Sequence, residues 1–350
     1  MRRRLMIFLL AGLLILGLTP PAAAAGGYSD VPADHWSAGD VARATELGLF
    51  QGVGGGKFGL GRPITRAAFA TALTRLFGWE EVKPDRPSYT DVSRDSWYYG
   101  AVETIQANGA VDASNRKFRP DDNLTRDEMA SMLVRGLGYT SLAGTAASYG
   151  TPFSDVTANP GFITLAYDLG IMDGKGKGRF DPDGDATREQ AAAVLVRVYD
   201  RLAEPSVRLE SAGEYRLITI STPTAQGGEK MPVTPLEPLP ELYAALRRMK
   251  NNGEDMSRMA LQLMAGGVRT ITDAGGNPVA ASTLISAKEV QEALSRKDAK
   301  TFYSEGYQSA YCVYAPNAYQ SATVWYQSEE SMAAKLQLAK LFGVTQYVME

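Results

Sequence analysis

One phrase occurs three times in the first 203 residues of this chain, and it limits the fold more than any other feature. An Asp-Val pair near an aromatic residue is followed by a basic residue before Phe, and then by Thr-Arg at the start of an apolar run. The Thr-Arg pairs begin at Thr65, Thr125 and Thr187, so they lie 60 and 62 residues apart. This spacing predicts a supersecondary unit of that size, built three times.

Each copy has the pattern of helix, loop, helix. In the second copy, residues 97–109 have the apolar spacing and the glycine stop of a short helix. The second helix begins after the Thr: residues 125–128 form a capping box, and residues 187–190 its Gln form, whereas Ala68 leaves the first copy without the reciprocal partner. One such unit cannot bury the apolar stripe behind the cap by itself, so we expect the three second helices to pack together.

Composition and the N-terminus narrow the class of protein. Arg2 to Arg4 precede an apolar run of 14 residues and a small-residue stretch, the layout of a secretory signal peptide over residues 1–25. The run is shorter than the ~20 residues that span a bilayer, so we expect no membrane segment after removal of the signal. A net charge of -3 without a longer basic run excludes nucleic acid as a partner. The lone Cys312, between aromatic and apolar neighbours, is expected to be a core thiol.

The Asp-Val/aromatic opening and the Thr-Arg helix start resemble surface-layer (S-layer) homology repeats, over about residues 28–202. The resemblance implies a pseudo-threefold spindle with a central three-helix bundle and binding grooves between neighbouring repeats. It also implies non-covalent anchoring of an exported protein to the bacterial cell wall through pyruvylated secondary cell-wall polysaccharide, and a location at the cell surface, in the wall or S-layer. The expected fold class is therefore multi-domain: an all-α trimer of repeats followed by a small α/β domain.

The predicted domains follow from these boundaries. They are a signal peptide (1–25), three repeats (26–82, 87–140 and 151–203), a Pro/Thr/Gly-rich linker (204–238, with a strand near 215–220) and a small α/β domain (239–350). In the last domain the patterns predict helices at 242–249, 256–264, 286–295 and 329–342, strands at 268–272, 311–314 and 322–326, and a final apolar run at 344–349.

The repeated arginine is the predicted anion-binding group. It follows the N-cap, beside free N–H groups and the positive end of the helix dipole, and its guanidinium can hold a carboxylate with two parallel hydrogen bonds. The pyruvate ketal that the resemblance implies offers such a carboxylate, and the apolar face of its sugar suits an aromatic ring. The predicted polysaccharide-binding residues are Arg66, Arg126 and Arg188, with Trp36 and Trp97 as walls and Thr65, Thr125 and Thr187 at the helix starts.

An alternative role for these arginines is structural, in an ion pair with an Asp of the same or the next repeat. We interpret Asp30, Asp91 and Asp155 as structural, because a carboxylate would repel an anionic ligand. Ligand contact is expected less of Arg66, whose motif is altered. Phe162 replaces Trp in the third copy, and residues 112–116 of the second have no glycine, so these grooves are expected to differ.

The C-terminal part raises a second class of function. Residues 324–344 resemble the closing strand-helix-strand of family-18 glycoside hydrolases related to spore-cortex enzymes. The chain has no Asp-x-x-Asp-x-Asp-x-Glu run, and ~110 residues cannot close an eight-stranded barrel. We therefore predict no enzyme and no cofactor, with two alternatives left open: a cell-wall glycoside hydrolase or its inactive remnant, and a self-associating S-layer lattice subunit.

Neither a catalytic triad nor a calcium loop is expected. The only histidine, His35, belongs to the opening of the first repeat, far in sequence from Cys312. Asp181, Asp183 and Asp185 alternate as in a calcium loop, but alanines stand where that loop requires Gly and Glu, so no metal site is predicted.

Overall fold

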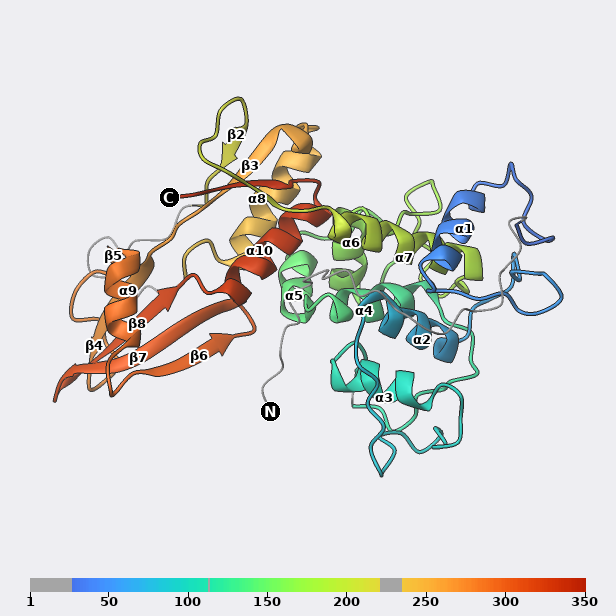
Figure 1. Cartoon of the computed structure of the whole chain (residues 1–350), viewed down its shortest axis with the longest axis horizontal. Helices are drawn as coiled ribbons and strands as arrows, with labels where there is room; N and C mark the ends of the chain where they lie inside the picture. Colours follow the sequence, from blue (N-terminus) through green and yellow to red (C-terminus); the bar gives the residue numbers. More distant parts are fainter. Residues whose placement is uncertain (1–26, 113, 221–234) are drawn as a thin grey trace. The chain divides into compact units, whose positions relative to one another are not determined.

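The computed structural model describes residues 27–112, 114–220 and 235–350 (Figure 1). The predicted signal peptide and the central part of the predicted linker lie outside these residues. Within them the chain forms two compact units that divide after Ala203.

Helices make up the regular structure of the first unit. Each repeat contributes the two helices that its pattern predicts, and one further helix, α5, joins the second repeat to the third. No element had been predicted for α5. The helices are α1 Ala38–Glu46, α2 Arg66–Leu76, α3 Tyr99–Ala107, α4 Arg126–Gly136, α5 Thr140–Ser148, α6 Pro160–Asp168 and α7 Arg188–Ala203.

Three backbone hydrogen bonds link the repeats in a closed ring. The N–H of Ile64 donates to the carbonyl of Ala186 (2.9 Å), the N–H of Ala186 to that of Leu124 (2.8 Å), and the N–H of Leu124 to that of Ile64 (2.8 Å). Each of these residues directly precedes a capping Thr. The first helix of each repeat packs on the second helix of another: α3 on α2, α6 on α4 and α1 on α7. The repeats are therefore one cooperative body.

The three helix caps differ in detail. The hydroxyl of Thr65 accepts the N–H of Ala68 (3.3 Å), and Thr125 forms the complete box with Glu128. At the third start, the side chain of Gln190 accepts the N–H of Thr187 (3.4 Å), but the buried hydroxyl of Thr187 has no hydrogen-bond partner among the described residues. The predicted Gln form of the box is therefore only half made.

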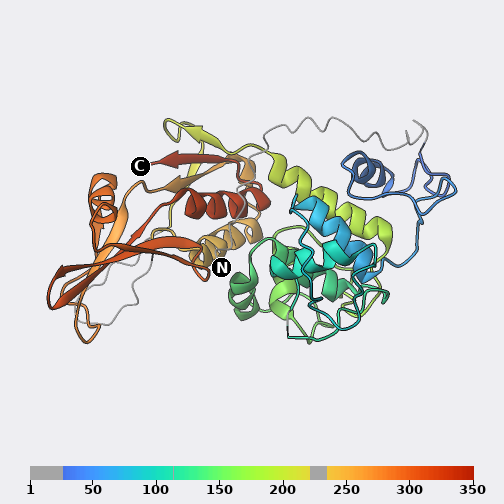
Figure 2. The ribbon, with the colours of Figure 1, turned by 60° about the horizontal axis from the view of Figure 1, so that its bottom comes forward.

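The second unit contains two sheets and three α-helices, which confirms an α/β region after the repeats. A four-stranded parallel sheet has the order β1-β9-β3-β2, and Figure 2 shows α8 and α10 on the same side of it. A five-stranded antiparallel sheet has the order β5-β4-β8-β7-β6 and packs against α9. The strands are β1 Val207–Leu209, β2 Arg216–Ile218, β3 Met259–Leu263, β4 Gly267–Asp273, β5 Thr283–Ile285, β6 Lys300–Ser304, β7 Ser309–Asn317, β8 Gln320–Tyr326 and β9 Gln346–Met349; the helices are α8 Leu239–Asn251, α9 Ala287–Leu294 and α10 Glu329–Leu341.

Two predictions for this unit are wrong. The helix expected at 256–264 is a single 3-10 turn, Met256–Arg258, followed by β3. Because β3 lies between two other strands of a parallel sheet, it is apolar almost throughout, and its sequence lacks the alternation that would distinguish it from a helix. The linker expected over 204–238 contains β1 and β2, whose hydrogen-bond partners are the distant strands β9 and β3.

The predicted core thiol is confirmed. Cys312 is fully buried between Val324, Ile285 and Val290, in the layer that α9 makes with the five-stranded sheet. Burial raises the pKa of this thiol.

Candidate ligand-binding site

Each motif arginine reaches from the start of its helix to a loop of another repeat. Its Nε–H donates to the carbonyl of a phenylalanine there, and its guanidinium lies over the ring of the same phenylalanine. The pairs are Arg66 with Phe118 (2.7 Å to the oxygen, 4.9 Å to the ring centre), Arg126 with Phe180 (2.9 and 4.6 Å) and Arg188 with Phe58 (2.9 and 5.0 Å). These contacts fix the orientation of each guanidinium plane.

The backbone N–H groups of the motif arginines are already used. Those of Arg66, Arg126 and Arg188 donate to the carbonyls of Asp122, Gly184 and Arg62, each at 3.0 Å. The expected contribution of free N–H groups to anion binding is therefore wrong for these residues, because neighbouring loops occupy them. The guanidinium remains as the anion-binding group.

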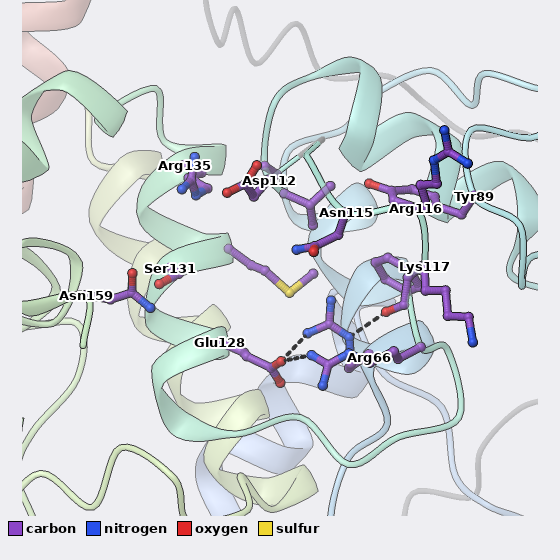
Figure 3. Close-up of a pocket in the computed structure, with 15 residues that line it drawn as sticks. Arg66, Tyr89, Asp112, Asn115, Arg116, Lys117, Glu128, Ser131, Arg135 and Asn159 are labelled. Atoms are coloured by element: carbon purple, nitrogen blue, oxygen red, sulfur yellow. Dashed lines mark hydrogen bonds and ion pairs between the residues drawn. The ribbon is translucent and has the colours of Figure 1, made fainter. Parts of the chain in front are cut away.

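The Arg66 pocket, of about 760 Å³, lies between α4 and the loop 110–119. Figure 3 shows Glu128 directed at Arg66 in this pocket. The carboxylate accepts from Nη1 of Arg66 at 2.8 Å and also pairs with Arg119. The cation of Arg66 is thus neutralised from within the protein.

The Arg126 pocket, of about 240 Å³, combines side chains of all three repeats. Arg126 of the second repeat donates from Nη2 to the carbonyl of Asp173 in the third (2.7 Å), and Trp36 of the first repeat lines the same pocket with 61% of its surface exposed. No carboxylate of the described chain comes within 4.0 Å of this guanidinium. Burial lowers the pKa of Arg126, although carboxylates farther away, including that of Asp181, oppose the shift.

The Arg188 guanidinium has the same kind of surroundings. Its Nη2 donates to the carbonyl of Gln51 at 2.9 Å. It too forms no ion pair within 4.0 Å in the part of the chain that the structure describes. Burial is the main cause that lowers the pKa of Arg188.

Sequence reasoning missed a second set of arginines. Arg75, Arg135 and Arg197 each stand ten positions after a capping Thr, so the period of the repeat could have identified them. Arg197 donates to the carbonyl of Ile171 (2.7 Å) and lines the Arg126 pocket. Arg135 lines the Arg66 pocket, and Arg75 donates to the loop that Arg188 contacts. Each motif arginine thus shares its loop or pocket with another cation.

The predicted structural aspartates hold the loops that carry the phenylalanines. Each carboxylate accepts backbone N–H groups: Asp30 from residues 58–60, Asp91 from residues 118–119 and Asp155 from residues 180–181. The N–H of Phe180 is the main cause that lowers the pKa of Asp155. None of the three carboxylates lies within ion-pairing distance of a motif arginine in the described ranges. The ion pair considered as an alternative is made by Glu128 and only to Arg66.

The remaining predicted residues take two positions. Trp97 is 71% exposed at the start of the second repeat, with its ring edge-on to Tyr98. The hydroxyls of Thr65 and Thr125 are directed to their own helix starts. Across residues 27–112, 114–220 and 235–350, no three His, Cys, Asp or Glu side chains gather as a metal site, and no helix is long and apolar enough to cross a membrane.

Comparison with known families identifies the repeats. The model of the S-layer homology domain matches residues 27–70, 88–130 and 152–192. The chain contains three S-layer homology domains. They indicate a location at the cell surface.

Relatives share these domains with this chain. The S-layer protein sap of Bacillus anthracis is 30% identical over 204 residues, which cover 57% of this chain and 24% of that protein. An endoglucanase of Bacillus sp. (strain KSM-635) is 32% identical over 196 residues, 52% of this chain and 20% of the enzyme. The match therefore spans about a quarter or less of these relatives.

Among solved structures, the spore cortex-lytic enzyme SleL of Bacillus cereus is similar to 39% of this chain and 30% of its own, at 17% identity and a TM-score of 0.31. It is an enzyme of the kind that residues 324–344 resemble. At this TM-score the likeness carries no conclusion about activity.

Proposed function

We propose that the three S-layer homology domains hold this exported chain on the bacterial cell wall by binding an acidic saccharide of the secondary cell-wall polysaccharide. The observation that carries the proposal is the Arg126 pocket, where a buried guanidinium without a carboxylate partner lies near an exposed Trp36. A cation that the fold leaves uncompensated in a pocket favours an anionic ligand.

The proposed arrangement of the repeats is a pseudo-threefold spindle with α2, α4 and α7 at its centre. The ring of hydrogen bonds through Ile64, Leu124 and Ala186 supports it, as does the cyclic packing of first helices on second helices. In such an arrangement each motif arginine faces a groove between two repeats.

The ligand's carboxylate, such as that of a ketal-linked pyruvate, would take the open side of the Arg126 guanidinium. Nε and Nη2 already donate to carbonyls, which leaves Nη1 for the ligand. Lys175 and Arg197 line the same pocket and add positive charge, and the face of Trp36 suits the apolar side of a sugar ring. By the equivalence of the repeats, we assign Trp97 to the site of Arg188.

Repetition would strengthen attachment. Single saccharide sites are weak, but two on one rigid body raise retention by a factor of ~10² to 10⁴ through effective concentration. A polymer that repeats its acidic unit can engage both sites at once.

The test is sedimentation of the full chain with purified wall sacculi, before and after removal of the secondary polymer. We expect binding to intact sacculi and loss of binding to stripped ones. Equal binding to both preparations would refute polymer docking.

For the C-terminal unit we propose a non-enzymatic cargo domain. The sequence has no paired-carboxylate run of the family-18 type, and the described part of the unit has four parallel strands in place of a closed barrel. Turnover of peptidoglycan or chitin oligomers by the full chain would overturn this proposal and favour a wall-remodelling hydrolase.

A further inference from the structure

We infer that Glu128 occupies the anion position of the Arg66 pocket, so that only the Arg126 and Arg188 sites take an acidic saccharide. This inference rests on the proposed function, because it names which of the three equivalent sites are open. It also assigns the difference to one position, three residues after the capping Thr.

Glu128 is held in the pocket from two sides. Its Oε1 contacts Nη1 of Arg66 at 2.8 Å and pairs with Arg119, while its Oε2 accepts the N–H of Thr125 at 3.1 Å. The side chains of Arg66 and Glu128 are only 11% and 22% exposed, so solvent screens their attraction little. The carboxylate therefore stands where a ligand's carboxylate would have to bind.

The equivalent positions in the other repeats carry no charge. Gln190 lines the Arg126 pocket, where its amide oxygen serves the cap of Thr187 as a carboxylate would. In the first repeat the position is Ala68, whose side chain has neither charge nor reach. One substitution at this position thus decides whether the arginine ahead of it is compensated.

The aromatic wall of the Arg66 pocket is also occupied. Arg135, which lines this pocket, lies 4.5 Å from the ring centre of Phe162, so its guanidinium covers the ring. Trp36 at the Arg126 pocket is exposed over 61% of its surface. A sugar entering the Arg66 pocket would therefore have to displace both a carboxylate and a stacked guanidinium.

A tethered carboxylate competes strongly with a free one. Groups on the same chain meet at effective concentrations in the millimolar range or above, so a weak monovalent ligand at lower concentration does not displace Glu128. Two sites of three are then active in the native chain.

The test counts bound ligand on the full chain. The probe is a methyl glycoside of an N-acetylhexosamine that carries a 4,6-linked pyruvate ketal, and the readout is the number bound at saturation in equilibrium dialysis. We expect two per native chain and three for Glu128→Gln, which keeps the cap acceptor in the form found in the third repeat. The reciprocal Gln190→Glu is expected to lower the number to one.

Circular dichroism melts show that each variant is folded before dialysis. Three probes bound by the native chain, or no gain on Glu128→Gln, would overturn the inference while leaving the proposed function intact. An unchanged number for Gln190→Glu would overturn the assignment to this position. No binding to the native chain or to either variant refutes the proposed function, and the inference with it.

Discussion

The guanidinium of Arg126 lies 4.6 Å from the centre of the Phe180 ring and donates Nε–H to the carbonyl of the same residue at 2.9 Å. The two residues belong to different repeats and are 54 positions apart. One side chain thus joins two repeats and presents the charge that we propose as the ligand-binding group. The expectation that a surface arginine could be removed at little cost does not hold for a side chain in this position.

Arg126→Ala is expected to lower the free energy of unfolding by about 2 kcal/mol, because two hydrogen bonds from a charged donor to buried carbonyls are lost. Urea unfolding followed by far-ultraviolet circular dichroism measures this change. The control is Arg94→Ala, whose side chain is 56% exposed and pairs only with an exposed Asp85, and which should stay within about 0.5 kcal/mol of the native chain. Equal effects of the two substitutions would contradict the structural role of Arg126.

Trp36→Ala is expected to weaken binding of the full chain to the pyruvylated glycoside about tenfold at the Arg126 site, the equivalent of ~1 kcal/mol of aromatic contact. Because the ring is 61% exposed, the melting temperature should change little. Tyr319→Ala, at a residue that is 81% exposed in the other unit, serves as the matched control. Affinity is measured by titration calorimetry, and unchanged affinity would remove Trp36 from the site.

The first unit is expected to lose stability in acid. Burial by itself raises the pKa of Asp30, but the N–H groups of residues 58–60 outweigh it, so the pKa is lowered; the pKa of Asp155 is lowered chiefly by the N–H of Phe180. A carboxylate whose pKa falls on folding stabilises the fold above its unfolded pKa of about 3.9, and this contribution is lost as the pH falls through the folded pKa.

Urea midpoints between pH 2.5 and 7 measure this effect. We expect a plateau above about pH 5 and a decline below pH 4. Asp155→Asn should flatten part of the decline, whereas Asp121→Asn, at an exposed position, should not. A decline of the same steepness in both variants would show that other groups carry the acid sensitivity.

Lys335→Met is expected to destabilise the second unit by about 3–5 kcal/mol, because it leaves the carboxylate of Glu237 buried without its cation. Nζ of Lys335 donates to Oε2 of Glu237 at 3.1 Å, and the two side chains are 1% and 2% exposed. Hydrogen exchange of the β3 and β8 amides measures the loss. Adding Glu237→Gln should recover part of it, and Lys288→Met, at an 87% exposed side chain, is the control.

Local patterns predicted the elements that local forces form. The capping sequence around Thr125 predicted the start of α4, and the same pattern at Ser286 predicted α9, because these hydrogen bonds join residues three positions apart. The strands β1 and β2 escaped prediction because their partners lie more than 40 and 130 residues away in the chain, so nothing near them in sequence marks them as strands.

The candidate site divides in the same way. The period of the repeat singled out Arg66, Arg126 and Arg188, since a residue type that returns at one position of a structural unit has one role to fill. It could not show that the loops of neighbouring repeats occupy the N–H groups at the helix starts, nor that Glu128 reaches Arg66. Both contacts cross a repeat boundary.

By itself, then, the sequence determined the number of repeats, their helix starts and the identity of the charged groups, because caps and periodic apolar faces act over a few residues. Only the tertiary structure decided which of those charges stay uncompensated. Coulomb attraction depends on distance in space and on burial, and the separation of 2.8 Å between Arg66 and Glu128 joins residues 62 positions apart.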